Sequence, residues 1–489
     1  MGAYQTVKTE SSDIRARLDH PVVDADGHIH EADFVVQDFL KQIGGSSIVQ
    51  RYIEVSSAPR PPGRPKSLFW GSFSGDHTID RATTMLPRLY ASRLDEAGID
   101  FSTLYSTLGF RWQVHPDEEL RRAVCRAFNM MYAEMFSAVS RRMTPAALIP
   151  MHTPQEGIDE LEFAVGKLGM KAIMTCNEVL RPNKLVASEA PALADRVLEY
   201  TPLAIDSPFD YDPFWAKCLE LKVVPAGHSM NFSGWHASPS NYVYNRLGFF
   251  ASYSHAAARA LFLGGVTQRF PKLNIAFLEG GVWWAVSLYN DLFEFWEKRN
   301  PGVMLDCHDP AKIDFALMEE MFREYGTERL TAERLLANRS AFTRDGRSQP
   351  GETPGFVTDD WRHLKINDRQ DIRDAFVDNF YFGCEADDAM NYTAFNSKAN
   401  KMGAKLKAVF SSDIGHWDVL HFGGILAEAH KQVDRGLMSS EDFRDFVFTN
   451  PITMQARVNP DYFKGTVVEE AVEQLLATRS ETGGKPLAA

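Results

Sequence analysis

The sequence has no C-x-x-C pair, no apolar segment among its first residues and no long apolar run. Its 489 residues include five cysteines, which are odd in number, widely spaced and without a C-x-x-C pair. This pattern argues against a disulfide framework and a thiolate zinc site, and it fits a reducing compartment. The N-terminus has no apolar segment of the signal-peptide kind, and no stretch approaches the length of a transmembrane helix. We therefore expect a cytoplasmic protein with no membrane partner.

Basic residues are fewer than acidic ones. The formal net charge is −13, whereas a nucleic-acid-binding protein usually carries a basic face. Aromatic residues are plentiful, with 33 Phe, 15 Tyr and 9 Trp. Most of them should lie in the core, but they also suit an apolar or aromatic pocket. We predict a small-molecule substrate as partner and no nucleic acid.

Strands and helices alternate regularly along the chain. Eight strand candidates are found, and nearly all of them are followed by a helix. Regular alternation favours a parallel sheet, and eight units favour a closed (β/α)8 barrel, the TIM type. No glycine-rich fingerprint follows the first strand, which argues against a dinucleotide-binding fold. The strands are expected in the opening stretch and at residues 101–107, 145–151, 171–176, 223–228, 274–279, 377–384 and 407–413.

The alternation of strands and helices is interrupted once, by a charged and partly helical segment. We interpret this segment as an insertion that serves as a cap or a dimer arm. A long loop rich in Pro, Gly and Ser lies earlier in the chain, and both segments make a homodimer plausible. The predicted organisation is an N-terminal arm (1–20), barrel units one to six (21–299) with the long loop (55–80), the insertion (300–376), the last barrel units with C-terminal helices (377–475) and a tail (476–489).

The first strand candidate, residues 22–31, is rich in metal-capable side chains. Side chains alternate along a strand, so Asp24, Asp26, His28 and His30 are expected on one face. Buried polar groups are costly unless something pairs with them, and a divalent metal pairs with imidazole and carboxylate together. The alternative is a turn rich in Asp and Gly whose histidines only form hydrogen bonds.

Other strand candidates end in similar groups. His228 ends the fifth strand, Glu279 the sixth and Asp413 the eighth, and His255 lies on the helix between the fifth and sixth. In a barrel of this type, catalytic residues lie at the carboxyl ends of the strands. One such residue alone is more often a cap or a loop anchor. Four strand ends that carry such groups predict an active site.

Four motifs occur in a familiar order: the D-x-D-x-H-x-H-E opening, His228 after V-V-P-A-G, F-P-K-L leading into F-L-E-G-G at 277–281, and S-S-D ending at Asp413. The chain resembles the amidohydrolase superfamily. Within it, the similarity is to the amidohydrolase-related decarboxylases and hydrolases, the aminocarboxymuconate-semialdehyde decarboxylase-like branch. The resemblance covers most of the barrel.

The resemblance implies that His228 and Asp413 are metal ligands and that Asp413 often also accepts a proton. The opening allows either Asp26 with His28 or His28 with His30 as the first-strand pair. We favour Asp26 with His28, and keep His30 as a pocket residue or a ligand of a second metal. Such nitrogen and oxygen ligands suit Zn²⁺, Mn²⁺ or Fe²⁺, as one or two ions.

The implied chemistry is that of a metal-dependent hydrolase. The metal would lower the pKa of a bound water, Asp413 would accept its proton, and His255 would help to polarise a carbonyl. The bond cleaved would belong to an ester, a thioester, an amide or an activated C–C group of a compound with an apolar or aromatic body. Many relatives have a histidine where this chain has Glu279, which makes Glu279 a candidate acid or base and favours hydrolysis.

Two other functions stay open. A non-oxidative decarboxylase would use the same scaffold and metal, and a barrel without catalysis would only bind a ligand. Aromatic residues of two loops are candidates for the substrate pocket, although they could equally belong to the core or to an interface: Phe69, Trp70, Phe232 and Trp235.

Overall fold

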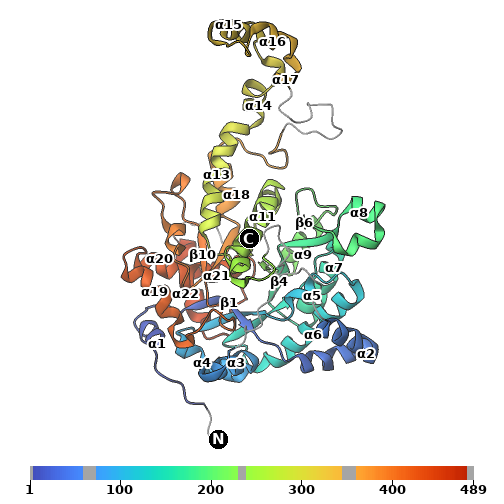
Figure 1. Ribbon diagram of the computed structural model, residues 1–489. Coiled ribbons are helices and arrows are strands. Elements are labelled where there is room, and N and C mark those ends of the chain that lie inside the picture. Colours follow the sequence, from blue (N-terminus) through green and yellow to red (C-terminus); the bar gives the residue numbers. More distant parts are fainter. Residues whose placement is uncertain (1–3, 59–72, 229–237, 344–358, 482–489) are drawn as a thin grey trace.

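Eight parallel strands form the centre of the molecule (Figure 1). The structure is a computed structural model that describes residues 4–58, 73–228, 238–343 and 359–481. Neighbouring strands of the barrel follow one another in chain order. Strands β5 and β6 are not part of the barrel and form a separate two-stranded sheet. The strands are β1 (Val23–Ile29), β2 (Phe101–Ser106), β3 (Met143–Leu148), β4 (Ala172–Cys176), β7 (Pro225–His228), β8 (Ile275–Phe277), β9 (Phe380–Glu385) and β10 (Lys407–Ser411).

The sheet closes on itself just beyond β10. The amide of Asp413 donates to the carbonyl of Asp26 over 2.9 Å, and the amide of His28 donates to the carbonyl of Ile414 over 2.8 Å. These bonds join the last strand to the first, so neither is left as a free edge. The predicted (β/α)8 barrel is confirmed.

Helices surround the barrel, as Figure 1 shows. Their ends follow ordinary capping chemistry: α4 begins at Pro87 and stops at Gly98, which is left-handed (φ 72°), and Asp117 accepts a hydrogen bond from the amide of Leu120 at the start of α6. The helices around the strands are α2 (Asp33–Ser57), α3 (Thr78–Met85), α4 (Pro87–Ala97), α5 (Phe110–Gln113), α6 (Glu118–Met135), α7 (Pro154–Leu161), α9 (Asp212–Glu220), α10 (Tyr242–Arg246), α11 (Phe249–Leu263), α12 (Val266–Arg269), α13 (Trp283–Arg299), α18 (Arg369–Val377), α19 (Ile425–Asp434), α20 (Ser440–Arg444), α21 (Asn450–Ala456) and α22 (Glu469–Glu481).

The N-terminal segment is docked on the barrel. Helix α1 (Glu10–Arg15) buries Ser11 and Ile14, and Arg15 pairs with Asp100, with 3.2 Å between Nη2 and Oδ1. None of the described helices is both long and apolar enough to span a membrane.

A hairpin follows β4, where we expected only a polar stretch. Strands β5 (Glu178–Pro182) and β6 (Leu198–Pro202) pair antiparallel, and helix α8 (Lys184–Glu189) lies between them. Only Val179 and Thr201 of the two strands are buried. The hairpin places Glu178 beside the end of β4, close to the carboxyl ends of the strands.

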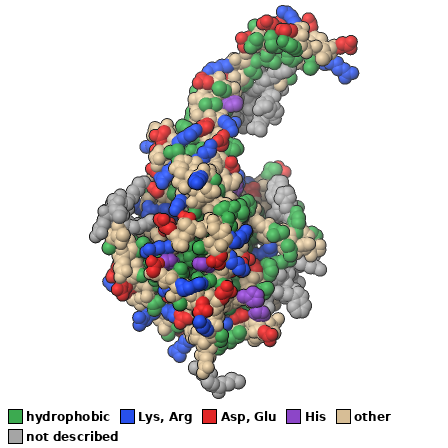
Figure 2. Space-filling view, turned by 90° about the vertical axis from the view of Figure 1, so that its left-hand side faces the viewer, with side chains coloured by type: hydrophobic (Ala, Val, Ile, Leu, Met, Phe, Trp, Pro, Cys, Tyr) green, Lys and Arg blue, Asp and Glu red, His purple; other side chains and the backbone are tan. Residues whose placement is uncertain are grey.

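A projecting arm follows α13, within the segment 300–376 that we predicted as an insertion, and Figure 2 shows it from another side. Figure 1 shows α13 running out from the barrel, with α14 to α17 at its far end and α18 returning to the barrel wall. We refer to residues 300–343 as the arm. It contains α14 (Pro301–Cys307), the short helix η5 (Pro310–Lys312), α15 (Phe315–Tyr325), α16 (Ala332–Ala337) and α17 (Arg339–Thr343).

Candidate metal centre

Strand β1 does not alternate as the sequence suggested. Its pairing with β2 is irregular between Asp24 and Gly27. A Cβ built on Gly27 would lie 2.9 Å from Oδ2 of Asp24, so these two residues face the same side of the strand. The expectation that Asp24 shares one face with Asp26 and His28 is therefore wrong, because the irregularity shifts the alternation.

Asp24 instead ties β1 to its two neighbours. Its Oδ2 accepts hydrogen bonds from the hydroxyls of Ser102 (2.6 Å) and Ser412 (2.8 Å). Its Oδ1 accepts from the amides of Ser412 (2.8 Å) and Asp26 (3.1 Å). The carboxylate therefore fixes the position of the strand that carries the metal-capable side chains.

Asp26, His28, His228 and Asp413 lie together at the carboxyl ends of β1, β7 and β10. His28 Nε2 is 3.5 Å from Asp26 Oδ1 and 3.1 Å from Asp413 Oδ1, and His228 Nε2 is 3.5 Å from Asp26 Oδ2. Two ligand atoms that each lie about 2.1 Å from one ion are separated by roughly 3.0–3.5 Å. The observed separations match that spacing. Asp26, His28 and His228 form one group of potential ligands, and His28 also belongs to a second group with Glu279, Asp413 and His416, so the structure offers two overlapping sets that could hold a divalent ion.

Few of these atoms are engaged in hydrogen bonds. Both oxygens of Asp26 and of Asp413, and Nε2 of both histidines, are buried and without a hydrogen bond in the described part of the chain. Burial raises the pKa of Asp26 well above its ordinary value, and the charges of Asp413 and Glu279 add to this rise. Burial lowers the pKa of His228 to about 4, which keeps the ring in the neutral form that binds metals. A cation would satisfy all of these groups.

Glu279 and Asp413 both adopt left-handed backbone conformations, with φ of 59° and 49°. For a residue with a side chain this costs about 1–2 kcal/mol, and such strain is concentrated at functional sites. Glu279 Oε2 lies 3.3 Å from Nδ1 of His228, the nitrogen that faces away from Asp26. Glu279 therefore orients His228 from behind, as a carboxylate commonly does for a metal-binding histidine.

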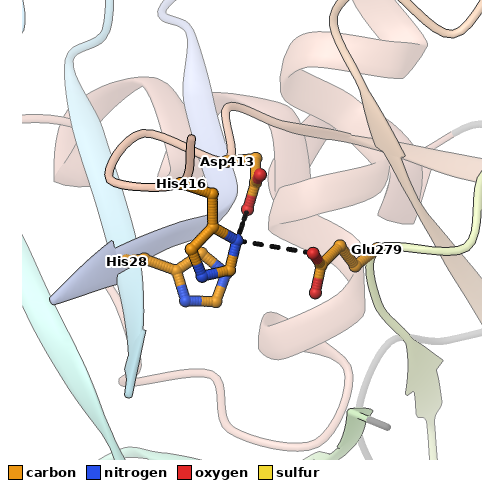
Figure 3. Close-up of side chains that lie close together, drawn as sticks. All are labelled: His28, Glu279, Asp413 and His416. Carbon is orange, nitrogen blue, oxygen red and sulfur yellow. Dashed lines mark ion pairs between the residues drawn. The ribbon is translucent and has the colours of Figure 1, made fainter. Parts of the chain in front are cut away.

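His416 is the functional residue that the sequence reasoning missed. Figure 3 shows one nitrogen of its ring joined by dashed lines to both Asp413 and Glu279, with the ring of His28 beside it. Its Nδ1 is 2.7 Å from Asp413 Oδ1 and 3.4 Å from Glu279 Oε1, and its ring stacks on that of His28 with 3.7 Å between centroids. The only signal in the sequence was its position three residues after Asp413.

The loop that carries His416 depends on a glycine. Gly415 has φ 116°, and a Cβ added to it would lie 3.1 Å from Cβ of His28. Burial lowers the pKa of His416, but the charges of Asp413 and Glu279 outweigh it and hold that pKa well above its ordinary value. His416 is 11% exposed, whereas Glu279 and Asp413 are 2% and 1% exposed. It is therefore the side chain of this cluster that solvent reaches most easily.

Two predicted residues lie apart from these groups. The structure contains three groups of side chains that could hold a metal among its described residues, and neither His30 nor His255 belongs to one. His30 follows β1, where burial and the charge of His416 lower its pKa to about 4, so it stays a candidate pocket residue. His255 packs edge-on against Trp284 of α13, with 6.0 Å between ring centroids. The predicted pocket residues Phe69, Trp70, Phe232 and Trp235 lie outside the described residues.

A small cavity of about 10 Å³ adjoins His228 and has room for about one water molecule. One carboxyl group, Glu178 of β5, lies in its wall, and burial raises the pKa of this group to about 8. The sequence did not point to Glu178. The lining is otherwise mostly apolar: Phe110, Gln113, Val114, Cys176, Glu178, Leu180 and His228.

This chain combines a parallel (β/α)8 barrel with buried carboxylates and imidazoles at the carboxyl ends of its strands. The combination is typical of barrel enzymes whose sites can bind a metal. The model of the amidohydrolase family matches residues 25–331, which is more than half of the chain. The protein belongs to the amidohydrolase family, and the predicted superfamily is confirmed.

Several solved structures are similar to this chain at low sequence identity. An amidohydrolase, map2389c, from Mycobacterium avium subsp. paratuberculosis K-10 is 14% identical, with a TM-score of 0.50 over 90% of this chain and 100% of that one. A dihydroxybenzoic acid decarboxylase from Polaromonas sp. JS666, with bound manganese, is 15% identical, with a TM-score of 0.46 over 91% and 99%. The 5-carboxyvanillate decarboxylase LigW from Sphingomonas paucimobilis is 13% identical, with a TM-score of 0.44 over 89% and 98%.

Proposed function

We propose that the protein is a metal-dependent enzyme that removes carbon dioxide from a carboxylic acid without oxidation. Asp26, His28, His228 and Asp413 would hold one divalent ion, and their nitrogen and oxygen donors suit Zn²⁺, Mn²⁺ or Fe²⁺. When bound, the ion would polarise the substrate's oxygen atoms and stabilise the negative charge that develops next to them.

The observation that carries this proposal is the position of His416. The sequence favoured hydrolysis because Glu279 stands where many relatives have a histidine. His416 supplies an imidazole beside Glu279 from a different strand end, with 3.4 Å between Nδ1 and Oε1. The argument for hydrolysis thereby loses its basis, and the cluster gains a group that can deliver a proton.

Decarboxylation needs such a group. The bond between the carboxyl carbon and its neighbour breaks, carbon dioxide leaves, and the electron pair that remains on the neighbouring carbon must take up a proton. The Nδ1 proton of His416 is held towards Asp413 and Glu279, so Nε2 is the nitrogen that can donate. The reaction consumes one proton, which His416 recovers from solvent through its exposed edge.

The substrate would have a largely apolar body. The wall of the cavity beside His228 includes the apolar side chains of Phe110, Val114 and Leu180. It also includes the carboxyl group of Glu178. The cavity itself has room for only about one water molecule, so the body of an unsaturated or aromatic acid would lie outside it and only a small substituent would enter. A cytoplasmic location and a small-molecule partner remain part of the proposal.

Hydrolysis is the second candidate, and the pairing of His416 with Asp413 favours it. A protonated histidine held at 2.7 Å by a carboxylate can act as a general acid. Asp413 would take a proton from water, and His416 would give one to the leaving group of an ester, thioester or amide.

A panel of aromatic and unsaturated carboxylic acids, tested on protein reconstituted with Mn²⁺ or Zn²⁺, separates the two candidates. Wild-type protein should release carbon dioxide, and His416→Gln should keep the metal but lose about 10²–10⁴-fold in rate. His308→Gln, on the arm, is the matched control and should leave the rate unchanged. Acid release from esters or amides, with no carbon dioxide from any acid of the panel, would assign hydrolysis instead.

A further inference from the structure

The hairpin after β4 brings one carboxyl group to the edge of the metal centre. Side chains alternate along a strand, so Glu178 and Leu180 of β5 lie on one face and the buried Val179 lies on the other. Glu178 and Leu180 both line the small cavity beside His228. Because His228 is a candidate metal ligand, this cavity adjoins the place where a substrate would meet the ion.

The carboxyl group of Glu178 has a buried oxygen that lacks a partner. Its Oε2 forms no hydrogen bond with any of the described residues, and such a group is costly to bury. Other polar atoms of the cavity wall already have neighbours. The side-chain nitrogen of Gln113 donates to two backbone carbonyls, over 3.2 and 2.7 Å, and both ring nitrogens of His228 face carboxylates. A polar atom that enters the cavity would supply the partner that Glu178 lacks.

The hairpin that carries Glu178 is attached to the barrel at two points. The hydroxyl of Tyr200, on β6, lies 2.6 Å from the hydroxyl of Tyr253, on α11, and Figure 1 shows the hairpin beside this helix. Arg181, on β5, donates to the backbone carbonyl of His152, which follows β3. These contacts fix the strand, so Glu178 is already in position before a ligand arrives and little conformational entropy is lost on binding.

We propose that Glu178 determines which substrate the site accepts, by binding one oxygen substituent of the substrate inside the cavity. This inference rests on the proposed function, since it places the carboxylate of the substrate at the metal ion and the substituent beside His228. The cavity has room for about one water molecule, so a hydroxyl or carbonyl oxygen fits it and a second carboxylate does not. Burial raises the pKa of Glu178 to about 8, so at neutral pH the carboxyl keeps its proton and can donate a hydrogen bond to that oxygen.

The same wall disfavours other substituents of similar size. A methyl group would fill the space but leave the carboxyl of Glu178 without a partner, and a site built to bond a substrate oxygen rejects the analogue that lacks it. An ammonium group would lose its water against Phe110 and Val114 and would meet no negative charge on the protonated Glu178. The cavity therefore selects a carboxylic acid that carries one small, uncharged oxygen substituent.

Binding to the metal-loaded protein tests this inference without turnover. The probes are hydroxybenzoates and the methylbenzoates of the same substitution pattern, titrated by calorimetry into protein that contains Mn²⁺ or Zn²⁺. Wild-type protein should bind the hydroxyl member of at least one pair about 10–100-fold more tightly than the methyl member. Glu178→Leu cannot form the hydrogen bond and should lose this preference. Glu178→Gln, whose amide can donate, should keep part of it.

Glu199→Leu, an exposed substitution on the paired strand β6, is the matched control and should keep the full preference. The metal content of each variant, measured first, shows whether the centre is intact. Wild-type protein that does not distinguish the members of any pair, or a metal-loaded Glu178→Leu variant that distinguishes them as wild type does, would overturn the proposal.

The two proposals fail separately. A hydroxyl preference that disappears in Glu178→Leu, with no carbon dioxide released from any acid, would support the role of Glu178 and refute decarboxylation. Release of carbon dioxide, with the same ratio of hydroxyl to methyl affinities in wild type and Glu178→Leu, would refute the role of Glu178 alone.

Discussion

Glu178 provides a stability test that needs no substrate. Its Oε2 is buried and has no hydrogen-bond partner among the described residues, and burial raises the pKa of this carboxyl from 4.5 to about 8. In the unfolded chain the group loses its proton near pH 4.5, whereas in the folded protein it keeps the proton until about pH 8. Between these values the unfolded state binds fewer protons, so the free energy of unfolding falls as pH rises.

The size of the effect follows from the same shift. Each pH unit inside the window costs about 1.4 kcal/mol, so the wild-type protein should lose about 4 kcal/mol between pH 5 and pH 8 through this group. The contribution is fully present below about pH 4.5 and is lost by about pH 8. Glu178→Gln keeps the shape of the side chain and cannot titrate. The variant should therefore gain about 2–4 kcal/mol on wild type between pH 5 and pH 8.

Urea unfolding of both proteins at pH 5, 6, 7 and 8 measures this difference. Glu199→Gln, an exposed substitution on the paired strand β6, is the control and should follow wild type at every pH. A difference between Glu178→Gln and wild type that is the same at pH 5 and pH 8 would refute the reasoning, because it would mean that Glu178 titrates alike in both states.

Three further predictions concern the metal centre and its support. Asp24→Asn should lower the free energy of unfolding by about 2–4 kcal/mol, because one oxygen that accepts bonds from Ser102 or Ser412 becomes a donor; an unchanged urea midpoint would contradict this. Chelation should lower the melting temperature and added Mn²⁺ or Zn²⁺ should restore it, since the buried carboxylates lose and regain their counter-ion; calorimetry with no shift would argue against a bound ion. His255→Ala should keep the metal and catalyse within about threefold of wild type, because its ring packs on Trp284; a hundredfold loss would return His255 to the active site.

The grouping of most of the candidate metal ligands could be predicted because of how a barrel is built. Asp26, His228 and Asp413 are far apart in sequence, but the carboxyl ends of parallel strands meet at one end of a barrel. Recognising eight strands was therefore enough to bring these side chains together. The preference for Asp26 with His28 as the first-strand pair agrees with the distances at the site.

The residues that were missed depend on features without a periodic signal. His416 reaches the site through a turn whose Gly415 lies against β1, and nothing in the spacing of apolar residues reports such a contact. Strand β6 has a single buried residue, Thr201, so it shows no alternation. His255 was predicted to reach the active site, but it lies on a different face of α11. Its neighbour Ser254 is the residue that is buried towards Gly280, and successive residues of a helix point about 100° apart.

The metal content of the purified protein tests the central claim most directly. Protein produced with Zn²⁺, Mn²⁺ and Fe²⁺ supplied should contain about one equivalent of a divalent ion by elemental analysis. His228→Ala and Asp413→Asn should lose it, and the control His255→Ala should keep it. A wild-type protein that contains no metal and takes up none of the three ions would contradict the account, as would full retention of the ion in both ligand variants.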